Sequence, residues 1–196
     1  MIPKFIRLGV ETILKIICEK IIIKDILINN KNDKFDGIID ELYIKAESII
    51  FNKINISNIS INLRNLVLRF AFNNKKFFID NCHAVIKIRL TRDNINKTLF
   101  NKKWKGLKTS IESFISMNFK SIEIINNKLI YFIPVEEFSN KNIDYTLRYD
   151  IHSISLVNNN NQEKLSILND KNINIKNLLF YENYIELELS SKIIFN

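Results

Sequence analysis

Apolar and polar residues alternate one by one over most of this chain, and this pattern limits the possible folds more than any other feature. The alternation begins near residue 21 and continues to residue 90, most clearly in "LYIKAESIIF", "INISNISINLRN" and "HAVIKIRL". It returns after residue 119, as in "SIEIINNKLIYFIPV". A period of two places successive side chains on opposite faces of a strand, so half-buried β-strands are predicted over both regions.

Two segments have helical spacing instead. In residues 1–22, charges recur every three or four positions along one side, which predicts an amphipathic helix of about 18–20 residues, roughly 27–30 Å long. The charged stripe is Lys4, Arg7, Glu11, Lys15 and Glu19, and the apolar side is Ile6, Val10, Ile13, Leu14, Ile17 and Ile21. Residues 91–118 form the second helical segment, where Gly106 predicts a kink or a break.

The order of these segments indicates a single α+β domain over residues 1–196. Strands are expected over 23–90 and 119–196, on either side of the helical segment, and the absence of a βαβ rhythm favours antiparallel pairing. The apolar positions shift from even to odd between Ile56 and Ile59, so a bulge or turn is expected at Ser57–Asn58. Turns are also expected at Gly37, in the basic segment 72–80 and at Asn126–Asn127.

The charge balance favours anionic partners. The chain has 196 residues and a formal net charge of +8, which suits nucleic acid, acidic lipid headgroups or an acidic protein. The heavy use of Ile, Asn and Lys is typical of proteins from AT-rich genomes, so part of this charge is expected to carry no function. With 46% hydrophobic residues, the chain is expected to fold around a core.

Reactive chemistry is scarce, and we expect the protein not to be an enzyme. Three glycines cannot build the phosphate-binding or nucleophile loops of the common catalytic motifs. The acid pairs Asp40–Glu41 and Glu136–Glu137, like the neighbours Cys82 and His83, would point to opposite faces of a strand. Neither Cys18 nor Cys82 lies in a metal-ligand spacing, so two buried thiols in a reducing compartment are expected, without a metal.

The N-terminal apolar run does not predict a membrane span. Its charges leave no uncharged stretch of ~20 residues, and no signal-peptide cleavage site follows it. The expected location is therefore the cytoplasmic side, soluble or peripheral to a membrane.

The segment "NKKWKGLK", residues 101–108, has the strongest functional potential. An aromatic residue among lysines suits an acidic membrane surface, and it also suits stacking on nucleic acid. A packed Trp104 with solvated lysines around it is an equally good interpretation. The apolar stripe of this helical segment could be plain core or the wall of a lipid cavity; its members are Phe100, Trp104, Leu107, Ile111 and Phe114.

The segment "RLTRDNINKTL", residues 89–99, resembles the L-T-x-x-D-L-N-x-x-L signature of the LmeA-like phospholipid-binding family, which is common in cyanobacteria. The matching positions are Leu90, Thr91, Ile95, Asn96 and Leu99, and Asn94 replaces the family's acid. The preceding amphipathic helix and the strands from Gly37 onward also resemble the family, over residues 5–133. Independently, Thr91 is placed to cap the following helix by accepting a hydrogen bond from the amide of Asp93 or Asn94.

The resemblance implies a fold like half of a tubular, BPI-like lipid-binding module, in which a long helix lies in a strongly curved antiparallel sheet. It also implies a phospholipid-binding protein without a cofactor, peripheral to the inner or thylakoid membrane. Acyl chains would lie against the apolar stripe of residues 100–114. The anionic headgroup would meet Lys102, Lys103, Lys105 and Lys108.

Two other functions fit the residues as well. A basic nucleic-acid-binding module would explain the charge, and it predicts an affinity that falls steeply with salt. A scaffold domain would have a fully packed core and no cavity. The oligomeric state stays open.

Overall fold

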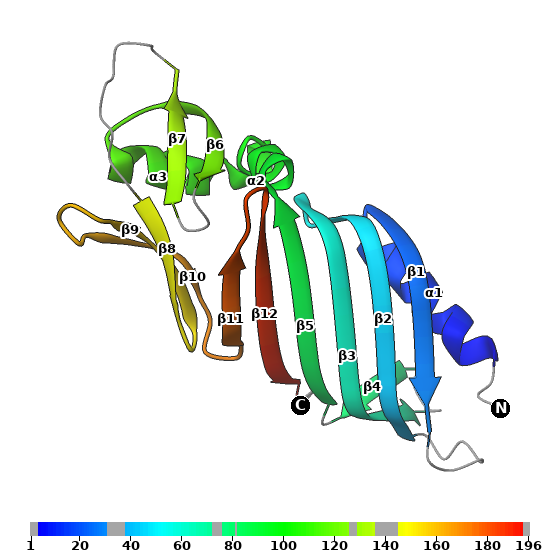
Figure 1. The fold of residues 1–196 in the computed structure, drawn as a ribbon. Helices are drawn as coiled ribbons and strands as arrows, with labels where there is room; N and C mark the ends of the chain where they lie inside the picture. The colour runs from blue at the N-terminus through cyan, green and yellow to red at the C-terminus, as the bar shows by residue number, and fades with distance from the viewer. Residues whose placement is uncertain are drawn as a thin grey trace.

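The computed structural model describes residues 4–30, 38–71, 76–80, 82–125, 129–135 and 145–193. Over these residues the chain has an α+β fold, as predicted, in which helices lie against two antiparallel sheets (Figure 1). The helical elements are α1 (Lys4–Ile17), α2 (Arg92–Leu99), the short 3-10 turn η1 (Lys102–Trp104) and α3 (Lys105–Ile115).

The larger sheet joins its strands in the order β1-β2-β3-β5-β12-β11, and β4 pairs with β3 beyond the end of β5. Its strands are β1 (Lys20–Asn29), β2 (Ile38–Phe51), β3 (Ile54–Ala71), β4 (Lys76–Asp80), β5 (Cys82–Thr91), β11 (Asn174–Phe180) and β12 (Tyr184–Ile193). The smaller sheet has the order β10-β9-β8-β7-β6. Its strands are β6 (Phe119–Ile125), β7 (Leu129–Pro134), β8 (Tyr145–Asp150), β9 (Ser153–Asn158) and β10 (Lys164–Asn169).

The registers of the larger sheet place its apolar residues in rows that cross every strand from β1 to β11. One row pairs Ile26 with Ile44, and the pairing continues through Ile61, Ile86, Leu189 and Ile175. The next row contains Ile23, Ala46, Ile59, Ile88, Leu187 and Leu178. Because opposite residues of paired strands share a face, these rows form one continuous apolar face.

The opposite face of the same strands is polar and charged. Glutamates of β12 lie directly opposite cations of β5, and two of these pairs form ion pairs: Lys87 with Glu188 at 3.2 Å and Arg89 with Glu186 at 3.1 Å. On the other side of the sheet's centre, Glu41 accepts a hydrogen bond from Asn62 at 2.8 Å. The larger sheet is therefore two-faced, with an apolar side and a solvated side.

The N-terminal helix is shorter than predicted, so the expectation of a long helix is wrong. α1 has 14 residues, about 21 Å, and it ends at Ile17. The chain then joins the sheet, because the amide of Glu19 donates to the carbonyl of Ile50 at 2.8 Å and Lys20 begins β1. Ile21 accordingly packs from a strand and not from the helix.

The spacing of the charged stripe predicts ion pairs between residues four apart, Arg7–Glu11, Glu11–Lys15 and Lys15–Glu19, and these form only in part. Arg7 and Glu11 lie at 3.4 Å, one turn apart on α1. Glu19 lies beyond the end of the helix and pairs with Lys53 instead. The charged stripe is therefore confined to the helical turns before Ile17.

A bulge or a turn was predicted at Ser57–Asn58. The structure has no turn there, because β3 continues through both residues. The backbone irregularity lies on the neighbouring strand, where Ser48 has φ of 52°, between the pairs Glu47–Asn58 and Ile49–Ile56. Both strands thereby keep their apolar residues in the same cluster, and Ile49, Ile56 and Ile59 lie together there. Gly37, Asn126–Asn127 and residues 72–75 lie outside the described residues.

The central helical segment is broken, as predicted, but the break lies before Gly106. α2 ends at Leu99, and the side chain of Asn101 then caps η1 by accepting from the amide of Lys103 at 3.0 Å. Gly106 itself is the second residue of α3, and a Cβ there would meet no atom within 4 Å. The break therefore follows from the Asn101 cap and not from the glycine.

The smaller sheet packs against α2 and α3, and a second cluster joins it to the larger sheet. The first core contains Leu99, Ile111, Ile115, Phe119, Ile122, Ile130, Phe132, Tyr145 and Leu156. The second joins Ile124 and Ile154 of the smaller sheet to Ile175, Leu178 and Ile185 of the larger one. The alternation over residues 145–168, with the Asn-rich stretch 158–161 as its tip, predicts a single hairpin. The structure has three strands there instead, β8, β9 and β10, because a tight turn at Ile151–His152 precedes β9.

Candidate functional site

The apolar face of the larger sheet is covered at its two sides but not in its middle. At one side, Ile6 and Leu14 of α1 pack with Ile26, Leu42 and Ile44. At the other side, the smaller sheet packs on β11 and β12. Ile61, which packs against the first of these clusters, lies directly opposite Ile86 on β3 and β5, and both side chains are partly exposed.

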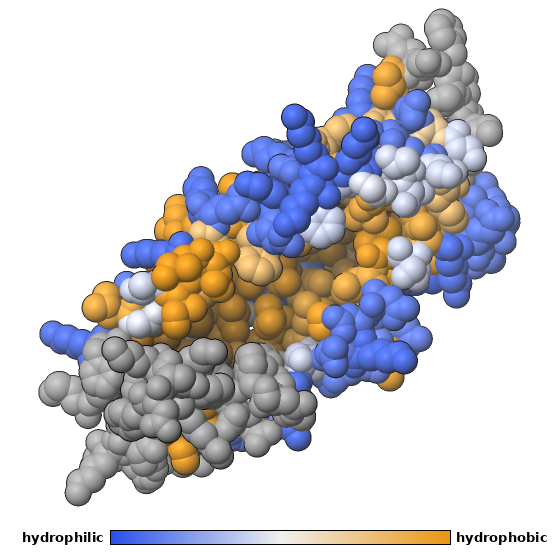
Figure 2. Space-filling view, turned by 180° about the vertical axis from the view of Figure 1, so that it is seen from behind, coloured by the Kyte–Doolittle hydropathy of each residue, from blue (hydrophilic) through white to orange (hydrophobic). Residues whose placement is uncertain are grey.

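The uncovered part of this face is lined by partly exposed aliphatic side chains. We call it the apolar groove, and its residues are Ile59, Ile61, Ile86, Ile88, Leu187 and Leu189. Figure 2, which shows the molecule from behind, displays a hollow lined mainly by hydrophobic residues and bordered by hydrophilic ones. Of the helices in the described residues, α2 makes the main contact with β3 and β5, and it lies at their ends (Figure 1).

The apolar stripe of residues 100–114 does not lie together in this groove. Ile111 is 4% exposed and belongs to the core of the smaller sheet, against which Leu107 and Phe114 also pack. Phe100 is 46% exposed, and its ring contacts that of Phe119 at 5.8 Å between centroids. Acyl contact by this stripe stays a prediction.

Trp104 connects η1 to the end of the larger sheet. Its indole Nε1 donates to the carbonyl of Asn52 at 3.3 Å, and Lys103 Nζ contacts the Asn52 side chain. Asn52 and Lys53 both have positive φ, 52° and 65°, which forms the tight turn between β2 and β3. The basic segment therefore lies at the end of the sheet where β2 and β3 meet.

The four predicted headgroup lysines have different surroundings. Lys108 forms an ion pair with Glu112 and lies 5.0 Å and 5.1 Å from the ring centroids of Phe100 and Phe119. Lys103 is held by Asn52. The other two, Lys102 and Lys105, are exposed, and neither contacts an acidic side chain of the described residues. These two lysines are thus the most available to an anion.

Positive charge at this end of the sheet acts on one acidic residue. The hydrogen bond from Lys53 lowers the pKa of the Glu19 carboxyl, and the charges of Lys53 and Lys103 lower it further. Glu19 therefore stays ionised and neutralises Lys53, while the neighbouring lysines keep the region basic.

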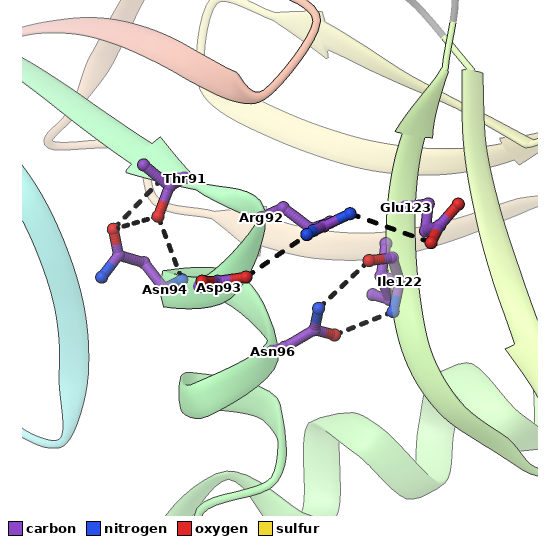
Figure 3. A network of polar contacts seen from close by, with 7 residues as sticks. All are labelled: Thr91, Arg92, Asp93, Asn94, Asn96, Ile122 and Glu123. Atoms are coloured by element: carbon purple, nitrogen blue, oxygen red, sulfur yellow. Dashed lines mark hydrogen bonds and ion pairs between the residues drawn. The ribbon is translucent and has the colours of Figure 1, made fainter.

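The stretch 89–99 is a structural joint between the two sheets (Figure 3). Thr91 caps α2: its hydroxyl accepts from the amide of Asn94 at 3.3 Å, and the Asn94 side chain accepts from the amide of Thr91 at 3.2 Å. Asn94 therefore completes a capping box with Thr91. Leu99 is buried, and Ile95 packs between the two cores.

Asn96 connects the same helix to the smaller sheet. Its side-chain amide donates to the carbonyl of Ile122 at 3.1 Å and accepts from the amide of Ile122 at 2.8 Å, as the edge of a strand would (Figure 3). Ile122 lies in β6, whose other edge pairs with β7. Asn96 thus occupies part of the free edge of β6 and holds α2 against it.

The described residues contain no group of three or more His, Cys, Asp or Glu arranged to hold a metal. Burial raises the pKa of the Cys18 and Cys82 thiols, which disfavours the reactive thiolate. Cys82 is buried and Cys18 is partly exposed, and they are not bonded to each other. Glu136–Glu137 lies outside the described residues.

Sequence reasoning missed the residues of the apolar groove as a site. Alternation predicts strands over these positions, but it does not reveal which apolar faces remain uncovered. One signal was available in the sequence: two short helical segments are too few to cover the apolar faces of both sheets. Strand order, which decides where the uncovered part lies, is not contained in the alternation.

Comparison of this chain with models of protein families, with curated proteins and with solved structures finds no match. In the part of the chain that the structure describes, no helix is both long and apolar enough to cross a membrane.

Proposed function

We propose that this chain is a non-enzymatic phospholipid-binding protein that acts at the periphery of a membrane. The observation that carries the proposal is the apolar groove, a continuous aliphatic surface that the described elements leave partly exposed. Leaving apolar surface in water is unfavourable by about 25 cal/mol per Å². A bound acyl chain would remove that cost.

The dimensions of the groove allow contact with part of an acyl chain. The groove spans three neighbouring strands, β3, β5 and β12, whose two spacings of about 4.8 Å make it about 10 Å wide. One leaflet of a bilayer has a hydrocarbon layer about 15 Å thick, half of the usual 30 Å. A phospholipid tail that crosses these strands could therefore place about two thirds of its length against the groove.

The basic segment at the end of the sheet suits the headgroup. Trp104 attaches this segment to the β2–β3 turn, so Lys102 and Lys105 lie near one end of the apolar face. An anionic phosphate there would meet positive charge without removing it from water, which costs little desolvation. The predicted headgroup lysines are thus retained, whereas the acyl contacts move from the helical stripe to the sheet.

The likeness to LmeA-like proteins supports the same function. Thr91, Asn96 and Leu99, which match that family's signature, make the joint between the two sheets. A half-tubular, BPI-like arrangement is part of this proposal, because in such a module one face of a curved sheet shelters lipid.

The test is the lipid content of a matched pair of variants. Ile86 faces the groove, whereas Val85, its neighbour in β5, lies on the polar face opposite Asn62. The protein is incubated with phosphatidylglycerol, separated from vesicles, and analysed by native mass spectrometry. Ile86→Asn places an amide against the acyl chain and should reduce bound lipid about tenfold, a cost of about 1.4 kcal/mol. Val85→Asn should bind as the wild type does.

Two results would contradict the proposal. One is a wild-type protein that carries no lipid after incubation, and the other is equal lipid content in both variants with unchanged thermal stability. The nucleic-acid alternative is measured in parallel with a fluorescent oligonucleotide: tight binding that falls steeply with salt, together with no lipid, would favour it.

A further inference from the structure

α1 carries a second apolar surface that it does not bury against the sheet. Ile6 and Leu14 are buried, at 8% and 9% exposed, and Val10 packs beside them. Other aliphatic side chains of the same helix are largely in water: Leu8 is 64% exposed, Ile13 59%, Ile16 76% and Ile17 52%. Exposed aliphatic residues gathered on one short helix indicate a surface for a partner.

Two of the exposed isoleucines, Ile13 and Ile16, lie beside the buried line of the helix, on the side away from the Arg7–Glu11 ion pair. At 100° per residue, Ile13 and Ile16 lie about 60° and 120° to one side of Val10. Arg7 and Glu11 lie about 60° and 100° to the other side. We call the surface of Ile13 and Ile16 the helix shoulder. Ile17 lies about 20° from Val10, at the C-terminal end of the buried line, and Leu8 extends the shoulder toward the outer side of the helix, about 80° beyond Ile16.

The charges of α1 identify the kind of partner. Glu11 is paired with Arg7 at 3.4 Å. Lys4 and Lys15 are exposed and contact no acidic side chain among the described residues. Lys15 lies on the outer side of the helix, about 100° from Ile16, so its ammonium group can remain at the level of lipid headgroups while Ile16 enters the apolar layer.

A second copy of the chain fits this surface less well than an anionic bilayer does. A second copy packed on the helix shoulder would bury the isoleucines but would leave Lys4 and Lys15, about 150° and 130° from the centre of the shoulder, without an anionic partner. An anionic bilayer offers an apolar layer for the isoleucines and negative headgroups for the lysines, the usual pairing for a helix that lies in a membrane interface. The net charge of +8 adds a general attraction to such a surface.

We infer that α1 is the membrane-docking element of this protein, and that it lies in the interface of an anionic bilayer with its helix shoulder inserted. This inference rests on the proposed function, since it states how a lipid-binding protein would reach its lipid. α1 packs along β1, at one side of the apolar face (Figure 1). Docking through α1 would therefore bring the groove close to the lipids that it takes up.

The test is flotation with vesicles of phosphatidylcholine alone or of phosphatidylcholine mixed with phosphatidylglycerol. Ile16→Ser should weaken binding to the mixed vesicles about tenfold, because one aliphatic side chain no longer enters the apolar layer. Ile151→Ser is the matched control: Ile151 is 60% exposed in the turn before β9, and its replacement should leave vesicle binding unchanged. Lys4→Gln with Lys15→Gln should remove the preference for phosphatidylglycerol.

Lipid content and oligomeric state, measured on the same samples, separate the different failures. Loss of flotation by Ile16→Ser with normal lipid content in detergent supports the inference. Equal flotation of Ile16→Ser and wild type overturns it and leaves the groove proposal standing, whereas a wild type without lipid overturns the proposed function. A wild-type dimer that Ile16→Ser converts to monomer would overturn the inference in favour of a second copy.

Discussion

Asn96 should contribute more to stability than any other polar side chain of α2. Its two hydrogen bonds, at 3.1 Å and 2.8 Å, satisfy both backbone groups of Ile122 on the free edge of β6. Asn96→Ala removes both, at a net cost of about 1 kcal/mol each. Alanine is the better helix former by about 0.5 kcal/mol, so the free energy of unfolding should fall by about 1.5 kcal/mol.

Urea unfolding and thermal unfolding measure this loss. For a chain of about 200 residues, 1.5 kcal/mol corresponds to a decrease in Tm of about 3–6 °C. Lys97→Ala is the control, because Lys97 is the exposed neighbour in the same helix, and its replacement should change stability by less than about 0.5 kcal/mol. If Asn96→Ala were no less stable than Lys97→Ala, α2 would not be held to β6 in the way described.

Two further predictions concern single polar groups. Thr91→Ala should lower the free energy of unfolding by about 1 kcal/mol, because it removes the helix cap. Lipid binding, measured without urea, should be unchanged. Loss of lipid binding at unchanged stability would refute the structural role of Thr91. For Glu41, hydrogen bonds from Asn62 and then Asn29 lower the carboxyl pKa, so its stabilising effect is present above the ordinary pKa of a glutamate and is lost as the pH falls through the folded-state pKa. Glu41→Gln should therefore flatten the acid side of the stability profile, and an unchanged profile would contradict this.

Most of the strands could be predicted because their two faces differ so strongly. In β5, Ile86 and Ile88 alternate with Lys87 and Arg89, and one side of the strand is apolar while the other forms ion pairs. The residues of the two faces are neighbours in the sequence, so local periodicity is sufficient to detect the difference.

The end of α1 could not be predicted in the same way. The helical spacing continues beyond Ile17, but the backbone of Glu19 pairs with Ile50, a residue more than about thirty positions away. A run of three isoleucines, 21–23, also favours a strand. Whether this segment forms helix or strand is decided by pairing with a distant residue, Ile50. Local periodicity carries no information about that pairing.

The candidate site was only partly predictable for a related reason. The joint at Thr91 could be derived from local capping chemistry, although the role of Asn96 depends on β6, which lies 26 positions away. By its sequence, the helical stripe around Ile111 could either be buried in a protein core or contact a bound lipid. In the structure Ile111 packs against the smaller sheet and is part of the core. The uncovered middle of the apolar face depends on strand order and on the placement of α1.

Photo-crosslinking with a phospholipid that carries a diazirine in its acyl chain tests the central claim most directly. After irradiation, labelled residues are identified by peptide mass spectrometry, with unlabelled lipid as competitor. We predict labels on the groove residues of neighbouring strands, above all Ile61, Ile86 and Leu189, which share one row of the sheet. Labels on the polar-face residues Ser60, Val85 and Ser190 instead, or none that the competitor removes, would contradict it.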